Sequence, residues 1–487
     1  MSARLPVFAL LGAVLATAAP IQLHPENPHY FLFRGRATVL VTSAAHYGAV
    51  LNPDFEYRKY LETLAADGLN YTRIFSGSYV EAPGAFGIAR NTLAPAPGRF
   101  LAPWARSGTP GYHNGGNKFD LDRWDDAYFA RLKDFVAEAG RRGVVVEMTL
   151  FSSQYAEMNW ANCPLNRENN VNATDAIDRR QLHTLANGNI LGHQERLVRK
   201  LVRELNGFDN VLYEIQNEPW SDRTVTVDTI NPYLQPPALS VYPNAVDVAD
   251  ADSVAWQARV ASWIRAEESA LPERHLIAQN YCNFRYPVTE VAPGVSIINF
   301  HYAYSEAARL NYGLGKLLAY DETGFAGRED SFYRKQAWNF LLAGGGTFNN
   351  LDYSFTVGRE DGTDTEPNGP GGGSPALRRQ LGVLSRFLGS LDVVKMRPDP
   401  VVVVSAPGLY TQALSLPGER YAVYATGAGP GRLELAIPAG TYASEWIDTK
   451  TGAVIKRERL AHGDGTLVLA SPAFEEDVAL RIVRASP

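Results

Sequence analysis

Two apolar runs in the sequence each end in a glutamate followed by a turn. The first ends at Asn217-Glu218-Pro219 and the second at Glu322-Thr323-Gly324. In a barrel of parallel strands, such strand ends meet at one mouth, where the chemistry of these barrels takes place. Two carboxyl groups facing each other across a sugar can cleave a glycosidic bond, because one protonates the departing oxygen while the other attacks the anomeric carbon. This pair of glutamates predicts that chemistry.

Short β-branched runs alternate with amphipathic helical stretches, which is typical of a parallel sheet with crossover helices. Helices are expected from a start at Asn52-Pro53 to a stop at Gly68, around 124–136, 197–205 and 253–265, and from Ser374-Pro375 to about 388. The sequence predicts an α/β fold, a (β/α)8 TIM barrel. Its eight strands are expected at 39–42, 70–75, 144–150, 211–216, 276–279, 295–300, 317–320 and 347–351.

The pattern changes near residue 393. Short alternating runs at 420–424, 432–437, 442–447 and 478–483 are separated by Gly, Pro and Asp turns, as in a small antiparallel β-sandwich. We therefore expect a barrel domain over 19–392 and a C-terminal β-sandwich over 393–487. Within the barrel, the segment 76–118 is rich in Gly, Pro and aromatic residues, and such a long irregular stretch usually indicates a functional loop.

The first 18 residues have the order of a secretory signal peptide. Arg4 precedes an apolar stretch, and Ala16-Thr17-Ala18 forms an A-x-A cleavage site. The expected product is secreted, periplasmic or extracellular, although a buried N-terminal helix is the alternative. No other segment of the sequence is long and apolar enough to cross a membrane.

Charge and composition limit the partners and cofactors. A net charge of −6 and a pI near 5.9 provide no basic field for nucleic acid or an anionic membrane. The nine His form no H-x-H or H-E-x-x-H pattern, so we expect neither a metal nor a cofactor. Cys163 and Cys282 both lie just beyond expected strand ends, which is compatible with a disulfide or with two unpaired thiols. The oligomeric state is open.

The motif YEIQNEPW at 213–220 resembles the fourth-strand signature of clan A glycoside hydrolases, and the resemblance extends over most of 30–390. It implies that Glu218 is the general acid/base and that Asn217 binds the substrate 2-hydroxyl. Glu322, in AYDETGF at the seventh strand end, resembles the nucleophile of the clan. Asp321 is the rival carboxylate, and the Glu-x-Gly ending favours Glu322.

The same resemblance supplies supporting residues. Arg73, in NYTRIF, matches the arginine beside the nucleophile, where a fixed cation would keep that carboxylate ionised. His301 and Tyr302, in INFHYAY, resemble the His and Tyr of the sixth strand end. The spacing here lets Tyr304 compete with Tyr302 for the tyrosine role.

Three further residues are candidate sugar contacts. Trp220, just after the acid, and Tyr281 offer aromatic faces for stacking, although a loop aromatic is as often an anchor to the barrel. His46, beyond the first strand, is a candidate for a sugar hydroxyl.

The sequence thus predicts a secreted retaining glycoside hydrolase that cleaves O-glycosidic bonds of a poly- or oligosaccharide by double displacement. A catalytically inactive carbohydrate-binding protein on the same barrel is the alternative. A metal-dependent amidohydrolase would need His pairs that the sequence lacks. The identity of the glycan, its linkage, and endo or exo action are left open.

Overall fold

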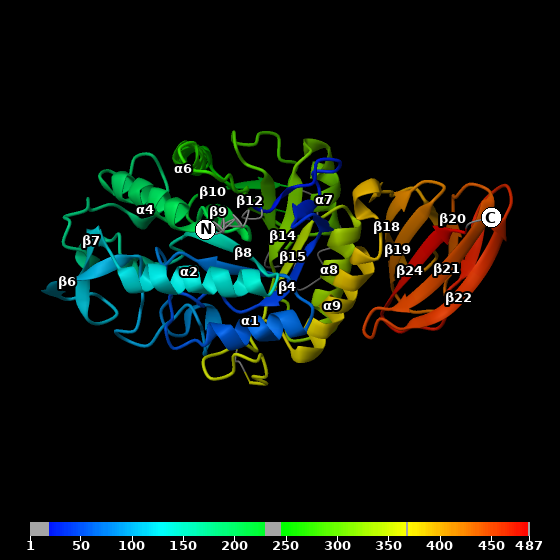
Figure 1. The fold of residues 1–487 in the computed structure, drawn as a ribbon, viewed down its shortest axis with the longest axis horizontal. Coiled ribbons are helices and arrows are strands. Elements are labelled where there is room, and N and C mark those ends of the chain that lie inside the picture. The colour runs from blue at the N-terminus through cyan, green and yellow to red at the C-terminus, as the bar shows by residue number, and fades with distance from the viewer. Residues whose placement is uncertain (1–18, 229–244, 367–368, 486–487) are drawn as a thin grey trace, which may run out of the picture.

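The computed structural model describes residues 19–228, 245–366 and 369–485, so the expected signal peptide at 1–18 lies outside the described residues. A parallel barrel surrounded by helices is followed by antiparallel sheets (Figure 1). All eight expected barrel strands are present, with ends that differ by a few residues from those expected. They are β4 (Leu40–Ala44), β5 (Tyr71–Phe75), β8 (Val145–Ser152), β9 (Val211–Asn217), β12 (Ile277–Asn283), β13 (Ile297–His301), β14 (Leu317–Glu322) and β15 (Thr347–Leu351).

The hydrogen-bonded order of the wall is β4-β15-β14-β13-β12-β9-β8-β5. Where β5 comes round to β4, the side chain of Asn70 bridges the two strands. Its Oδ1 accepts from the Val41 N–H at 2.8 Å, and its Nδ2 donates to the Val39 carbonyl at 2.9 Å. A side-chain amide carries both a donor and an acceptor, so one residue can stand in for a backbone pair at this position.

Helices cover the outside of the barrel. They are α1 (Tyr57–Ala66), α2 (Asp126–Arg141), α3 (Glu157–Asn162), α4 (Ile190–Leu205), α6 (Ala251–Glu268), α7 (Ser305–Asn311), α8 (Asp330–Leu342) and α9 (Pro375–Gly389). As expected, Ser374 caps α9: its side chain accepts from the Leu377 N–H.

Two expected helix starts are wrong. The first helix opens not at Asn52-Pro53 but at Tyr57, with Glu56 as its N-cap. The Asn52 side chain instead accepts from Asp54 N–H and donates to the Thr92 carbonyl, so this asparagine holds a loop turn. Trp124 ends a strand, β7 (Asn117–Trp124), and Asp125 caps α2 after it.

The barrel interior has an apolar layer below a polar one. A sheet of three short strands, β1 (Gln22–Leu23), β2 (Phe31–Phe33) and β3 (Arg36–Thr38), packs against the lower layer through Leu23, Phe31 and Phe33. Since alternate residues of a strand face the same side, the next inward positions form the upper layer. The lower layer includes Leu40, Tyr71, Val145, Leu212, Ala278, Ile297 and Leu317. The upper layer includes Arg73, Glu147, Glu214, Asn280, Asn299 and Asp321, all buried.

The C-terminal region forms two antiparallel sheets around its own core, in which Trp446 is fully buried. One sheet has the order β16 (Arg397–Pro398), β18 (Tyr410–Leu416), β19 (Arg420–Thr426), β24 (Asp477–Arg484), β21 (Gly440–Asp448), β22 (Val454–His462). The other contains β17 (Val403–Ser405), β20 (Arg432–Leu435) and β23 (Leu467–Ala470). The sandwich lies against α8 and α9 (Figure 1). There, Arg334 of α8 donates to both carboxylate oxygens of Asp477 at 3.0 and 2.6 Å.

Two hairpins that the sequence did not reveal stand among the loops after the barrel strands. The segment after β5 contains the 3-10 turn η1 (Ala85–Gly87), and β6 (Trp104–Pro110) pairs with β7. After β9, β10 (Thr224–Asp228) pairs with β11 (Ala245–Ala249), which adds to the edge of β12. Cys163 and Cys282 are both buried and free. Among the described helices, we find none with the length and apolar character that a bilayer crossing requires.

Candidate active site

Glu322 faces the barrel mouth because β14 is irregular at its end. The register along β13 and β14 pairs Phe300 with Tyr320, and then His301 with Glu322, so Asp321 is an extra residue in the ladder. Such a bulge re-aims the side chains around it. As a result, Glu322 lines the central cavity, while Asp321 lies fully buried in the polar layer. The two rival carboxylates of the sequence therefore occupy different environments.

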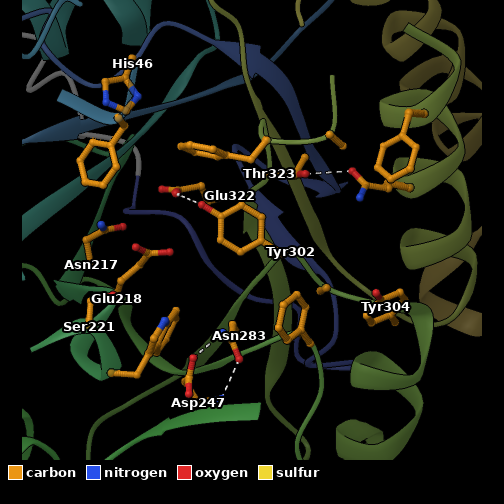
Figure 2. Close-up of a pocket in the computed structure, with 18 of the residues that line it drawn as sticks. His46, Asn217, Glu218, Ser221, Asp247, Asn283, Tyr302, Tyr304, Glu322 and Thr323 are labelled. Carbon is orange, nitrogen blue, oxygen red and sulfur yellow. Dashed lines mark hydrogen bonds between the residues drawn. The ribbon is translucent and has the colours of Figure 1, made fainter. Parts of the chain in front are cut away.

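Three donors converge on the Glu322 carboxylate. Arg73 Nη1 and the Tyr47 hydroxyl donate to its Oε2 at 2.9 and 2.8 Å, and the Tyr302 hydroxyl donates to its Oε1 at 3.0 Å. Burial alone would raise the pKa of Glu322, but the positive charges of His301 and Arg73 lower that pKa below its usual value. Glu322 is thus held as an anion. It is Tyr302 that binds Glu322, while Tyr304 lies away from it on the cavity wall (Figure 2).

Glu218 follows β9 in a left-handed backbone conformation, with φ of 48°, and precedes the 3-10 turn Pro219–Ser221. Neighbouring groups hold this conformation, because its N–H donates to Asn280 Oδ1 at 3.1 Å and its carbonyl accepts from the Ser153 hydroxyl at 2.6 Å. The side chain points into the cavity. There, Oε2 accepts from the Tyr155 hydroxyl at 2.9 Å, and Oε1 lies 3.0 Å from His301 Nδ1.

The structure brings the two glutamates together around His301. One carboxylate oxygen of each, together with a ring nitrogen of His301, lie within 4.8 Å of one another. Figure 2 shows both carboxylates directed into the same space. His301 Nδ1 lies 3.7 Å from Glu322 Oε1, and Nε2 lies 3.4 Å from Asp321 Oδ1. Burial alone would lower the pKa of the His301 ring, but the charges of Glu322 and Asp321 raise it well above its usual value.

Arg73 ties the site to the polar layer beneath it. Its Nε and Nη2 donate to the two oxygens of Glu214 at 2.7 and 2.5 Å, and Nη2 also donates to Asn217 Oδ1 at 2.7 Å. This contact orients the Asn217 amide, whose Nδ2 donates to the Tyr155 hydroxyl at 2.6 Å. Deeper in the layer, burial and the nearby charges of Glu214 and Asp321 raise the pKa of Glu147 to about 8.

The remaining candidates of the sequence divide into two groups. Trp220 and His46 line the cavity, which has a volume of about 1200 Å³. The Trp220 ring meets the edge of His301 at a centroid distance of 5.3 Å. Tyr281 does not line the cavity: β12 ends four residues later than expected, so Tyr281 falls inside the strand and points away from inward-facing Asn280. Its hydroxyl donates to the Glu290 carbonyl at 2.6 Å, so the structure does not bring Tyr281 to the glutamates.

Sequence reasoning missed two residues that contact the site. Tyr47 follows His46 just beyond the first strand, but a lone Tyr after a strand end carries no specific signal. Glu214 was detectable, because it lies two and four residues before Gln216 and Glu218 and so shares their face of the strand. Tyr155, in the loop after β8, also contacts the site, because its hydroxyl donates to Glu218.

The same cluster has the composition of a metal ligand set, since two carboxylates and an imidazole lie close together. In this site, however, the guanidinium of Arg73 supplies the positive charge next to Glu322. A divalent cation there would have to share the Glu322 carboxylate with that guanidinium and two phenol donors, which is an unfavourable arrangement of charges.

Several solved structures share this architecture. A Bacteroides vulgatus protein provisionally described as a glycoside hydrolase has a TM-score of 0.63 and 14% identity, over 96% of this chain and 83% of its own. A glycoside hydrolase family 5 protein from the same organism has a TM-score of 0.61 and 11% identity, over 96% and 95%. A third, described as a glycoside hydrolase, has a TM-score of 0.61 and 12% identity, over 96% and 98%. This chain has their fold.

At these identities the likeness concerns the fold alone. A family model described as a domain of unknown function (DUF6298) matches residues 92–180, the segment that carries β6, β7, α2, β8 and α3. A search of curated protein sequences gave no match.

Proposed function

We propose that this protein is a retaining glycoside hydrolase in which Glu322 is the nucleophile and Glu218 the general acid/base. The observation that carries the proposal is the approach of their carboxylate oxygens to within 4.8 Å at the mouth of the barrel. A double-displacement enzyme needs its two carboxyl groups about 5–5.5 Å apart, whereas an inverting enzyme needs more room for a water molecule. The spacing therefore favours covalent catalysis.

In the first step, ionised Glu322 attacks the anomeric carbon and the glycosidic C–O bond breaks, while Glu218 gives its proton to the departing oxygen. In the second step, Glu218 takes a proton from water, and the water oxygen replaces Glu322 on the sugar. The guanidinium of Arg73 supports the first step by keeping Glu322 anionic. His301 Nδ1 and Glu218 Oε1 share one hydrogen bond, so the imidazole can hold the proton of this bond when Glu218 is ionised.

The substrate we propose is an O-linked poly- or oligosaccharide, and the fold likeness to proteins described as glycoside hydrolases supports this class. A catalytically inactive carbohydrate-binding protein would not need Glu322 to be held as an anion, so the charges around Glu322 favour an enzyme. Export is part of the proposal and rests on the order of residues 1–18. N-terminal sequencing of protein from the culture medium or periplasm should find cleavage after Ala18, and intact Met1 would contradict export.

The test of the nucleophile is chemical rescue. Glu322→Ala should abolish turnover of an aryl glycoside, and azide should partly restore it with inverted anomeric configuration, because the small anion fits the space of the lost carboxylate. Asp321→Asn is the matched comparison, since Asp321 neighbours Glu322 but lies outside the cavity, and azide should not rescue it. Rescue of Asp321→Asn alone would reassign the nucleophile.

The acid is tested by the leaving group. Glu218→Ala should slow substrates with poor leaving groups far more than activated aryl glycosides, which depart without a proton. Equal losses on both substrates would reassign the acid. Product that forms with the variants of both glutamates would refute the glycosidase itself.

A further inference from the structure

The cavity is bridged by two aromatic rings on one side of the glutamates. Phe86, from η1 after β5, meets Phe325, from the loop after β14, with ring centroids 6.5 Å apart in an edge-to-face arrangement. Both rings line the cavity and are exposed, each at 41%. Because β4 and β15 lie between β5 and β14 in the barrel wall, a contact between these two loops passes over the ends of β4 and β15.

The bridge is fixed to the catalytic pair at both ends. The Phe86 ring contacts the Tyr155 ring at 5.0 Å, and the Tyr155 hydroxyl binds Glu218. The Phe325 ring contacts the Tyr302 ring at 5.9 Å, and the Tyr302 hydroxyl binds Glu322. A chain of rings therefore runs from one carboxylate to the other and forms a closed frame with them.

The backbone of Phe86 is strained in a way that presents its ring. Phe86 has φ of 55°, between Gly84 at 80° and Gly87 at 72°. For a bulky residue, this left-handed conformation is a genuine outlier, and such strain gathers at ligand clamps and active sites. Ile88, buried directly after the turn, anchors it to the barrel. The turn thus holds an aromatic ring out over the cavity at a cost in backbone energy.

Beneath the bridge the cavity wall is buried and includes two polar side chains. His46 and Glu81 line it there and are buried, at 8% and 3% exposure. Neither ring nitrogen of His46 has a hydrogen-bond partner within the described residues, although Nε2 lies 3.5 Å from a Glu81 oxygen. Tyr79 and Asn91 donate to the Glu81 carboxylate and fix its position. A buried imidazole with unused nitrogens beside a fixed carboxylate is well suited to bind vicinal sugar hydroxyls.

On the other side of the glutamates the cavity opens to solvent. Its lining there includes exposed Thr224 and half-buried Asp247. Figure 2 shows His46 and Asp247 at opposite ends, with Glu218, Glu322 and Tyr302 between them. Glu218 lies nearer the open end in this view, so the leaving group that it protonates departs in that direction.

We infer that the enzyme is exo-acting and removes a terminal sugar from the non-reducing end of its substrate. The sugar that becomes attached to Glu322 lies on the non-reducing side of the broken bond, so it occupies the end that the Phe86–Phe325 bridge closes. A chain that continued past this sugar would meet the bridge and the wall behind it. His46 and Glu81 bind hydroxyls of the terminal sugar, and the rest of the chain leaves through the open end. This inference rests on the proposed function.

The test uses the full-length enzyme and oligosaccharides of β-linked glucose, mannose and xylose that carry a fluorescent label at the reducing end. The expected first products are the free monosaccharide and a labelled chain shorter by one unit. The glucose and mannose oligosaccharides with a 4,6-O-benzylidene group on the hexose at the non-reducing end should be cleaved at least tenfold more slowly. Internal cleavage that still requires Glu322 would overturn exo action and leave the glycosidase intact. Cleavage of no member of the panel would refute both.

Two sets of variants connect the result to the named residues. Phe86→Ala and Phe325→Ala should raise the rate on blocked oligosaccharides at least tenfold relative to unblocked ones, whereas Phe332→Ala, an exposed cavity residue outside the bridge, should not. Glu81→Gln should raise the inhibition constant of the released monosaccharide about tenfold or more, as expected for a lost hydrogen bond to a charged group. If the ratio of rates on blocked and unblocked oligosaccharides is unchanged in Phe86→Ala and Phe325→Ala, the bridge does not close the cavity. If the inhibition constant is unchanged in Glu81→Gln, Glu81 does not bind the terminal sugar.

Discussion

Replacing Arg73 with Met should destabilise the protein strongly at neutral pH, because several buried anions depend on this one cation. The Arg73 guanidinium has no solvent-exposed surface and makes hydrogen bonds to Glu214, Asn217 and Glu322. Removing one partner of a buried charge pair costs about 3–5 kcal/mol, since the remaining charge is left uncompensated. With an unfolding entropy of about 2.1 cal/mol/K per residue, a barrel of roughly 370 residues should melt about 4–6 °C lower.

The deficit should shrink as the pH falls. In the wild type, Glu322 and Asp321 have pKa values lowered by His301 and Arg73, so they add stability that is present above the usual carboxyl range and is lost on acidification. In the Arg73→Met variant the same buried carboxyls keep the charge of His301 but lose that of Arg73, so in the folded state they bind protons more readily than in the wild type. Acidification therefore favours the folded variant relative to the folded wild type, and the two melting curves should converge between about pH 7 and pH 4.

Melting temperatures of both proteins across this range, followed by calorimetry or circular dichroism, provide the measurement. Arg99→Met is the control, because Arg99 is exposed and its ion pair among the described residues is with Asp54 at the surface, so its melting temperature should match the wild type at every pH. A deficit for Arg73→Met that stays constant with pH would refute the electrostatic explanation. Such a result would assign the loss to packing of the side chain instead.

Two further stability predictions concern the contact between β4 and β5 and the junction of the barrel with the sandwich. Asn70→Ala leaves the Val41 N–H and the Val39 carbonyl without their side-chain partner, so it should lower the free energy of unfolding in urea by about 1–3 kcal/mol. Asn70→Asp keeps only the acceptor and should lower it by less. Equal stability of the wild type and both variants would contradict the Asn70 bridge. Arg334→Met removes the cation beside the buried Asp477 carboxylate, so it should lower the unfolding free energy of the sandwich by about 3–5 kcal/mol. Replacing the exposed Arg457 with Met should leave that free energy unchanged. An unchanged unfolding transition of the sandwich in Arg334→Met would show that this ion pair does not couple the sandwich to the barrel.

The sequence was sufficient for the barrel because its signals are local and repeated. Most barrel strands contain β-branched residues, as at 144–146 and 297–298, and the helices between them carry apolar residues on one face, such as Leu197, Val198, Leu201 and Leu205 of α4. The sequence predicts strand ends that fall too early, because the last residues of the strands are polar, as at Asn280 and Asn283 of β12. Inside a barrel mouth, polar residues continue a strand instead of ending it.

Features that depend on long-range contacts could not be predicted. The sequence carries no signal for the bulge at Asp321, because strict alternation along the strand would direct only one of Asp321 and Glu322 inward. The Tyr47 contact with Glu322 joins residues from opposite ends of the barrel chain. The position of Tyr281 away from the cavity has the same origin, since the full length of β12 determines which way its side chain faces.

The different surroundings of the two glutamates support one assignment of roles over the reverse. Glu322 receives a guanidinium and two phenol donors, whereas Glu218 receives one phenol donor and shares a hydrogen bond with His301. Arg73 reaches Asn217, the neighbour of Glu218, through its amide oxygen and brings no hydrogen bond to the Glu218 carboxylate itself within the described contacts. A nucleophile must stay ionised while an acid must be able to regain a proton. Exchanging the roles would place the strongest cation beside the group that has to be protonated, so the charge distribution favours attack by Glu322.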